Sequence, residues 1–347
     1  MRTLIPAVVR TTARPAAAAT ALAAAAVLAL AGCSSATSGT DGSPDDGGPA
    51  SDTFPVRLDN CGFAAEIPAP PERVVTIKSS TTEMLLALGL GDRIVGTAFL
   101  DGPVPESLTD AAADVPALAE PLTDEAPGSE AVLELEPDLI YAGWESNLTA
   151  ETAGDRETLA ALGVATYVSP AACKDPAYMP NPLTFDHVFG EIEEIGRVFG
   201  AEDAAADLVA EQRSALAAIE PDDRGLTALW YSSGDDVPYV GAGIGAPQMI
   251  MDAAGLENVA ADVRDTWTSF AWEEAVAADP DVIVLVDAAW NTAEAKRERL
   301  AENPATAEMT AVRNENYVVV PFPATEAGVR NVDAAADVVD QLGALGR

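Results

Sequence analysis

The sequence has little positive charge. Its 347 residues include 19 Lys and Arg side chains against 56 Asp and Glu, which gives a formal net charge of -37. A field of this sign repels nucleic-acid phosphates and anionic lipid headgroups, so the composition argues against nucleic acid and other polyanionic partners. Lysine is especially scarce and occurs only as Lys78, Lys174 and Lys296, so the positions of these residues are informative.

Histidine is limited to one residue, His187. Bare zinc or manganese sites in proteins usually need several His ligands, so we expect no metal. Because His187 lies in a predicted helix, we expect a partly buried structural residue and not a general base. The sequence also has no HExxH, nucleophile elbow or P-loop motif. These absences favour a binding protein without a cofactor or catalytic residues over an enzyme; an adhesive or structural lipoprotein is the other alternative.

Long apolar runs are absent from residue 54 onwards. The one near the N-terminus, residues 16–30, is short and Ala-rich and follows three Arg residues, which is typical of a secretory signal. It ends in Leu-Ala-Gly-Cys33, which resembles the lipobox of bacterial lipoproteins, whose Cys is acylated after cleavage. We therefore expect a signal peptide over residues 1–32, a lipidated Cys33 followed by a flexible tether over 33–53, and attachment to the outer face of the cell membrane through the lipid alone. A cleaved signal with an incidental Cys is the alternative.

Cysteine is scarce as well, since only Cys61 and Cys173 follow the predicted anchor. In an exported protein, two cysteines with no other evident role are more often paired than reactive. We therefore expect a Cys61–Cys173 disulfide, with two reactive thiols as the alternative.

Residues 183–221 form a predicted connecting helical segment. Its apolar residues, such as Ile192, Ile195 and Val198, recur every three or four positions, and the pattern resumes after a break at Gly200 and ends at Pro221. Strand and helix patterns alternate on both sides. We predict an α/β protein of two Rossmann-like lobes, over 54–182 and 222–347, joined by a single long helix with a ligand cleft between them; the alternative is a pair of surface helices in one large domain.

An internal repeat supports two lobes of one architecture. In each half, a Glu is followed at identical spacing by a Pro-Asp pair and a strand, and each strand then leads into a Trp-bearing loop. These residues are Glu130, Pro137, Asp138 and Trp144 in the first half, and Glu273, Pro280, Asp281 and Trp290 in the second.

Polar and aromatic residues follow several predicted strands, and ligands of doubly wound sheets bind at this end of the strands. The aromatic rings suit stacking on a planar ligand, and the cations suit a carboxylate or phosphate. The Gly-rich residues 241–245 lack the spacing of a dinucleotide fingerprint, and we expect a flexible loop over the cleft. Trp230 and Trp272 are assigned to the core, and core packing is the alternative for every other Trp. The predicted ligand residues are Lys78, Trp144, Lys174, Tyr231, Trp267, Trp290 and Arg330.

Three runs carry a family resemblance: RVVTIKSSTTEMLLALGLGDRIVG, EAVLELEPDLIYAG and TWTSFAWEEAVAADPDVIVL. They resemble signature blocks of the helical-backbone class (class III) of periplasmic binding proteins for ferric siderophores and cobalamin. The resemblance covers residue 54 to the C-terminus. The runs LDNCG, SPAACK and PFPATEAGVRN also resemble an actinobacterial branch that is assigned to importers of a deazaflavin coenzyme precursor (F-420 type).

The resemblance implies a monomer that captures a small aromatic anionic ligand, a deazaflavin precursor, and delivers it to the permease dimer and ATPase of an ABC importer. A ferric siderophore or cobalamin is the alternative ligand. In the family, one acidic residue per lobe pairs with permease arginines, and these residues match Glu83 and Glu273 here; exposed Glu residues without a role are the alternative. Lys78 replaces the small residue that is common at its position, so ligand contacts of known members do not transfer to it.

Overall fold

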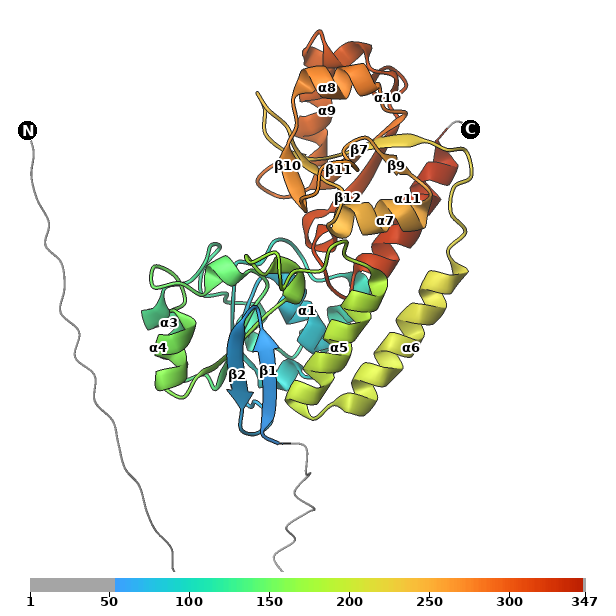
Figure 1. Cartoon of the computed structure of the whole chain (residues 1–347). Helices are drawn as coiled ribbons and strands as arrows, with labels where there is room; N and C mark the ends of the chain where they lie inside the picture. Colours follow the sequence, from blue (N-terminus) through green and yellow to red (C-terminus); the bar gives the residue numbers. More distant parts are fainter. Residues whose placement is uncertain (1–53, 346–347) are drawn as a thin grey trace, which may run out of the picture. The chain divides into compact units, whose positions relative to one another are not determined.

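The computed structural model describes residues 54–345. The predicted signal peptide, Cys33 and the tether lie outside this range. Within it, two sheets with flanking helices form two lobes, the first blue to green and the second orange to red in Figure 1. The predicted α/β class with two lobes is therefore confirmed.

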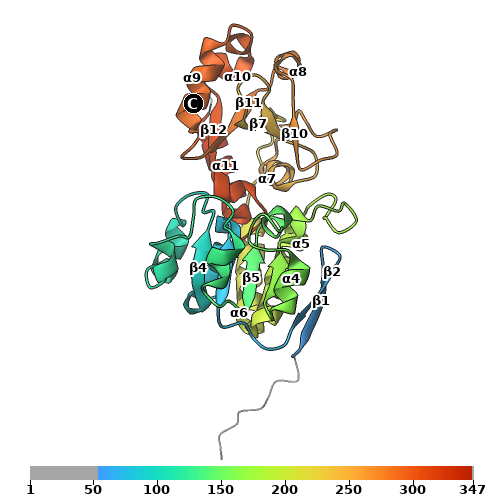
Figure 2. The same cartoon turned by 90° about the vertical axis from the view of Figure 1, so that its left-hand side faces the viewer.

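The first lobe contains a four-stranded parallel sheet in the order β4-β3-β5-β6. Its central strands β3 and β5 are buried on both faces, which explains their largely apolar sequences. An antiparallel hairpin, β1–β2, lies beside the sheet (Figure 2). The elements are β1 (Val56–Asn60), β2 (Phe63–Ile67), β3 (Val74–Ile77), α1 (Ser79–Ala87), β4 (Ile94–Ala98), α2 (Thr109–Ala112), α3 (Ser129–Leu133), β5 (Leu139–Ala142), α4 (Arg156–Ala161) and β6 (Ala165–Val168).

The connecting segment consists of two helices, α5 (Phe185–Phe199) and α6 (Glu202–Ala218), which pack side by side (Figure 1). Gly200 ends α5 in the left-handed conformation, with a φ of 64°, that glycine adopts at little cost. The apolar face of α5 packs into the core of the first lobe, and α6 then leads into the second lobe. The predicted single long helix is thus a helical hairpin, of which α6 alone makes the passage between the lobes.

The second lobe contains a six-stranded mixed sheet. Strands β7, β11 and β12 are parallel, as the sequence predicts, whereas β8 and β10 extend the sheet as short antiparallel strands that the sequence analysis missed. The elements are β7 (Thr227–Ser233), β8 (Tyr239–Gly241), α7 (Ala246–Ala254), β9 (Glu257–Asn258), β10 (Trp267–Ser269), α8 (Trp272–Ala278), β11 (Val282–Asp287), α9 (Ala293–Glu302), α10 (Thr310–Arg313), β12 (Tyr317–Pro321) and α11 (Asn331–Ala344).

One apolar core crosses the boundary between the lobes. Ile192 and Ile195 of α5 belong to the same buried cluster as Met249 of α7 and Val332 of α11. A shared core of this kind favours small movements of the lobes over a wide hinge. Trp230 and Trp272 are buried in the second lobe, which confirms their assignment to the core. No helix within residues 54–345 has the combination of length and apolar character needed to cross a bilayer.

Candidate functional site

A cavity of about 680 Å³ lies between the two lobes. The first lobe contributes Ser80 at the start of α1 and the loops that follow β5 and β6. The second lobe contributes the end of β7 and the loops that follow β11 and β12. The cavity therefore lies at the carboxyl ends of the parallel strands, where open α/β sheets bind ligands.

Aromatic side chains line much of this cavity. Trp267 stacks on Tyr239, with ring centroids 6.0 Å apart and planes at 15°. Trp290 packs edge-on against Phe322 and is 62% exposed. Trp144 lines the first-lobe side. Tyr239 and Phe322 were not predicted from the sequence, although Phe322 directly follows β12 and the expectation of ligands at strand ends could have identified it.

The Gly-rich loop before α7 is packed, and the prediction of a flexible loop is wrong. The amide groups of Ala242 and Gly243 donate to the carbonyls of Thr266 and Val263. A Cβ added at Gly243 would lie 1.9 Å from the carbonyl oxygen of Ala261. Glycine is needed here for close backbone packing, and the loop forms a fixed part of the cavity wall.

Lys78 does not reach the cavity, so its predicted ligand contact is wrong. The side chain is fully buried and pairs with Asp101, while Glu326 lies 3.5 Å from its ammonium nitrogen. The ammonium nitrogen also lies 3.7 Å from the ring centroid of Trp144. Lys78 has a φ of 91°, a region that strongly favours glycine, which explains why a small residue would suit this position.

Arg330 and Glu83 form an ion pair with each other, which overturns both predicted roles. Arg330 donates from Nε to Glu83 at 2.5 Å, makes a second bond to the other carboxylate oxygen, and donates to the carbonyl of Pro103 at 2.7 Å. Arg330 does not line the cavity, and Glu83, only 2% exposed, is not available to a permease. Burial raises the pKa of Glu83 above its ordinary value, although the guanidinium of Arg330 opposes this shift.

Tyr231 is also a core residue, contrary to prediction. It is fully buried against Trp272, and its hydroxyl donates to the carbonyl of Gly234 and accepts from Arg299. Side chains alternate along β7, and Tyr231 lies on the face that is covered by α8, whereas its neighbour Ser232 lines the cavity. The sequence located strand β7 correctly, but not the face of the sheet on which Tyr231 lies.

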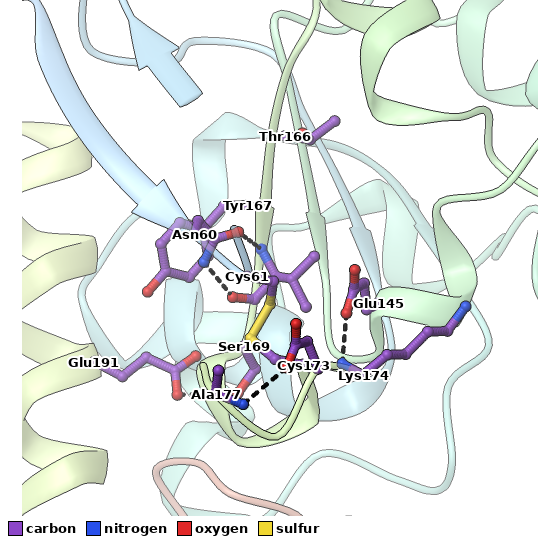
Figure 3. The surroundings of a disulfide bond; sticks show 12 residues. Asn60, Cys61, Glu145, Thr166, Tyr167, Ser169, Cys173, Lys174, Ala177 and Glu191 are labelled. Carbon is purple, nitrogen blue, oxygen red and sulfur yellow. Dashed lines mark hydrogen bonds between the residues drawn. A yellow bond between two sulfur atoms is a disulfide. The ribbon is translucent and has the colours of Figure 1, made fainter. Parts of the chain in front are cut away.

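The predicted Cys61–Cys173 disulfide is confirmed (Figure 3). Cys173 belongs to one wall of the cavity, which the disulfide therefore holds. Cys173 lies in the loop after β6, and the bond ties this loop to the turn between β1 and β2. The next residue, Lys174, lines the cavity with an exposed side chain, while its backbone amide donates to Glu145 at 2.5 Å (Figure 3). Trp144, Lys174, Trp267 and Trp290 thus lie in the cavity wall, and their contact with a ligand stays a prediction.

A buried carboxylate fixes the base of the same loop. Glu191 of α5 accepts hydrogen bonds from Tyr141 at 2.9 Å and from Ser169 at 3.0 Å. Burial raises the pKa of Glu191 to about 7, although both hydrogen bonds oppose the shift. Glu191 therefore joins the connecting helices to the cavity wall (Figure 3).

His187 has a structural role, but it is exposed and not partly buried as predicted. Its Nδ1 atom accepts from the amide of Thr184 at 3.1 Å, which caps the first turn of α5. Across residues 54–345, no group of three or more His, Cys, Asp or Glu side chains is arranged to hold a metal ion.

The repeated glutamates occupy equivalent places in the two lobes. Glu130 lies in the first turn of α3 and Glu273 in the first turn of α8, and both are exposed. Glu130, and not Glu83, is therefore the counterpart of Glu273. The identical spacing of the repeat in the sequence already indicated that Glu130 and Glu273 are equivalent.

Comparison with known proteins gives consistent matches. Residues 74–324 match the family described as periplasmic binding protein. The chain is 27% identical over 300 residues to YvrC of Bacillus subtilis, an uncharacterized ABC transporter substrate-binding lipoprotein, with 84% of this chain and 86% of YvrC covered. It is 31% identical to a cobalamin-binding protein of Halobacterium salinarum over 67% of this chain, a match that spans only 58% of that protein.

A solved structure agrees with this assignment. The structure is described as an ABC-type Fe3+-hydroxamate transport system from Saccharomonospora viridis. It is 28% identical to this chain and has a TM-score of 0.71, and the match covers 84% of this chain and 99% of that one. The chain therefore belongs to the periplasmic binding protein family, in its class III, and is a non-enzymatic substrate-binding component of an ABC transporter.

Proposed function

We propose that this protein captures a compact planar aromatic molecule between its lobes and delivers it to the permease and ATPase of an ABC importer. A deazaflavin coenzyme precursor is the candidate that best matches the cavity. Its fused ring offers a flat face to aromatic side chains, and its imide and ribityl groups offer hydrogen-bond donors. A strongly anionic tail is not required, because two of the three cations predicted to bind it are paired elsewhere.

The observation that carries this proposal is the aromatic lining of the cavity. Trp290 exposes 62% of its surface beside the cavity, an apolar area that a stacked ligand would remove from water. The volume of about 680 Å³ lies within the roughly 300–1,000 Å³ of pockets for small molecules. Seven Ser and Thr residues supply neutral hydrogen-bonding groups: Ser80, Ser146, Ser169, Ser232, Ser233, Thr266 and Thr325.

A corrinoid or a ferric siderophore is the second candidate, and the relatives favour it. One relative is named a cobalamin-binding protein, and the similar solved structure is described as a Fe3+-hydroxamate system. A complete cobalamin is larger than a deazaflavin and would project from the cavity. An anionic ferric complex would meet only one cation, Lys174, among the described residues that line the cavity.

Tryptophan fluorescence should distinguish these ligands. We expect saturable quenching when a deazaflavin precursor is added to the full chain, and weaker or no response to cobinamide and to a ferric hydroxamate siderophore. Trp290→Ala should weaken deazaflavin binding about tenfold, which corresponds to about 1.4 kcal/mol of lost stacking. Leu162→Ala, at a residue that is 60% exposed and outside the cavity, is the matched control. Saturable quenching by cobinamide or the siderophore alone would contradict the deazaflavin proposal.

Glu130 and Glu273 are the proposed permease contacts, because both are exposed at equivalent places in the two lobes. The double variant Glu130→Arg/Glu273→Arg should reduce uptake at least tenfold while the affinity for deazaflavin precursor stays unchanged, since neither residue lines the cavity. Glu302→Arg, an exposed glutamate at the end of α9, should leave uptake intact. Equal uptake by the double variant and the control would exclude this docking surface.

We also propose that the protein is held on the outer face of the membrane by a lipid on Cys33. The support is the lipobox-like sequence and the description of YvrC as a lipoprotein. The mass of the processed N-terminal peptide tests this proposal.

A further inference from the structure

Glu326 is the only carboxylate among the described residues that line the cavity. It lies in the second lobe, in the segment between β12 and α11, and is directed towards the first lobe. One carboxylate oxygen lies 3.5 Å from the Lys78 ammonium nitrogen, and the other lies 3.5 Å from the Ser80 hydroxyl. Both are long contacts for a group whose two oxygens can accept about four hydrogen bonds.

The surrounding charges do not neutralise Glu326. Lys78 is the nearest cation, but it makes its shorter ion pair with Asp101. Arg330, the other cation of this cluster, is paired with Glu83. Two cations thus face three carboxylates in this cluster, and the carboxylate next to the cavity has the weakest pairing.

We propose that Glu326 determines the ligand specificity of the cavity, by accepting a hydrogen bond from an N–H, O–H or ammonium group of the ligand. This inference rests on the proposed binding of a planar ligand in the same cavity. A charged acceptor bonds such donors about twice as strongly as a neutral one, and it repels a carboxylate or phosphate at the same place. The predicted anionic ligand is therefore replaced by one that presents a donor to Glu326.

Binding should depend on pH with a defined sign. Burial raises the pKa of Glu326 to about 7, an effect that Lys78 reduces and Asp101 reinforces. Below this pH the protonated carboxyl is neutral and donates a hydrogen bond itself, so its attraction for a cation is lost. A cationic ligand should bind more tightly as the pH rises from 5.5 to 8, and this gain should be absent in Glu326→Gln.

A pair of fragments with the same ring and opposite charge tests the proposal without the natural ligand. Isothermal calorimetry on the full chain would compare 2-naphthylmethylamine with 2-naphthoate at pH 8. We expect the amine to bind at least tenfold more tightly than the naphthoate. The ratio should fall to within about twofold in Glu326→Gln and in the unmodified protein at pH 5.5. Glu302→Gln, at an exposed residue outside the cavity, should keep the original ratio at both pH values.

Equal or tighter binding of naphthoate at pH 8, an unchanged ratio in Glu326→Gln, or no heat from the amine at millimolar concentration would each overturn the proposal. If Glu326→Gln does not fold, the pH dependence of the ratio in the unmodified protein decides. The two proposals fail separately. A deazaflavin titration without quenching leaves the fragment ratio in place, and a fragment ratio near one leaves the deazaflavin titration in place.

Discussion

Replacement of both disulfide cysteines in a Cys61→Ser/Cys173→Ser variant should lower the free energy of unfolding by about 4 kcal/mol. The two cysteines are 112 residues apart. In the chain-entropy description, a cross-link that closes a loop of about 100 residues removes close to 4.7 kcal/mol of disorder from the unfolded chain. Urea unfolding of the variant, compared with the oxidised protein at the same pH, measures the difference.

The same variant should also disturb the cavity. The bond joins the turn after β1 to the loop that carries Lys174, and this loop forms one wall of the cavity. We therefore expect weaker binding of deazaflavin precursor in addition to the lost stability. Reduction of the unmodified protein is the control, because it breaks the same Cys61–Cys173 bond without a substitution. A change below about 1 kcal/mol in the free energy of unfolding would show that other contacts hold the loop.

The elements that could be predicted from sequence are those whose signal is local. Strands β3, β5 and β6 can be recognised in the sequence, because buried parallel strands are short, largely apolar runs bounded by turn residues. The short strands β8 and β10 were missed, because three residues of a mixed strand show no period and depend on pairing with each other. The end of α5 at Gly200 was visible as a break, but the direction of the following helix was not.

The sequence predicted the location of the candidate site, but not the partners of its charged side chains. The rule of strand ends located Trp144, Lys174 and Trp290 in the wall of the cavity. The partners of Lys78 and Arg330, in contrast, depend on contacts over long sequence distances. Glu83 and Arg330 are 247 residues apart, and no pattern in the sequence shows that they meet. The few cations near the predicted strand ends were interpreted as a binding site for an anionic ligand. In the structure, Lys78 and Arg330 instead neutralise the protein's own buried carboxylates.

The Arg330–Glu83 ion pair should be costly to break by removal of one partner. Glu83 belongs to α1 of the first lobe and Arg330 adjoins α11 of the second, so the pair connects the lobes. Their side chains are only 2% and 11% exposed. Removal of one partner from a buried pair leaves an uncompensated charge and typically costs about 3–5 kcal/mol. Arg330→Ala should therefore destabilise the protein by about 3 kcal/mol or more at pH 8.

The pH dependence of this loss follows from Glu83. Burial already raises its pKa in the folded protein, and removal of Arg330 raises it further. A carboxyl group whose pKa is higher in the folded than in the unfolded state binds more protons when folded, so it destabilises the protein increasingly as the pH rises from its unfolded pKa through its folded pKa. The loss caused by Arg330→Ala should be smaller at pH 5 than at pH 8. Urea unfolding at both pH values measures it.

Two further variants distinguish the loss of the buried ion pair from a general effect of removing an arginine on stability. Arg330→Met/Glu83→Met removes both charges and should recover most of the stability lost in Arg330→Ala, because no buried charge then remains unpaired. Arg57 pairs with Glu66 at 2.7 Å, but these side chains are 69% and 56% exposed, so Arg57→Ala should cost less than about 1 kcal/mol. If Arg330→Ala lowered the free energy of unfolding no more than Arg57→Ala does, the cross-lobe ion pair would not stabilise the fold. The lobes would then be held together by the apolar core that α5, α7 and α11 share.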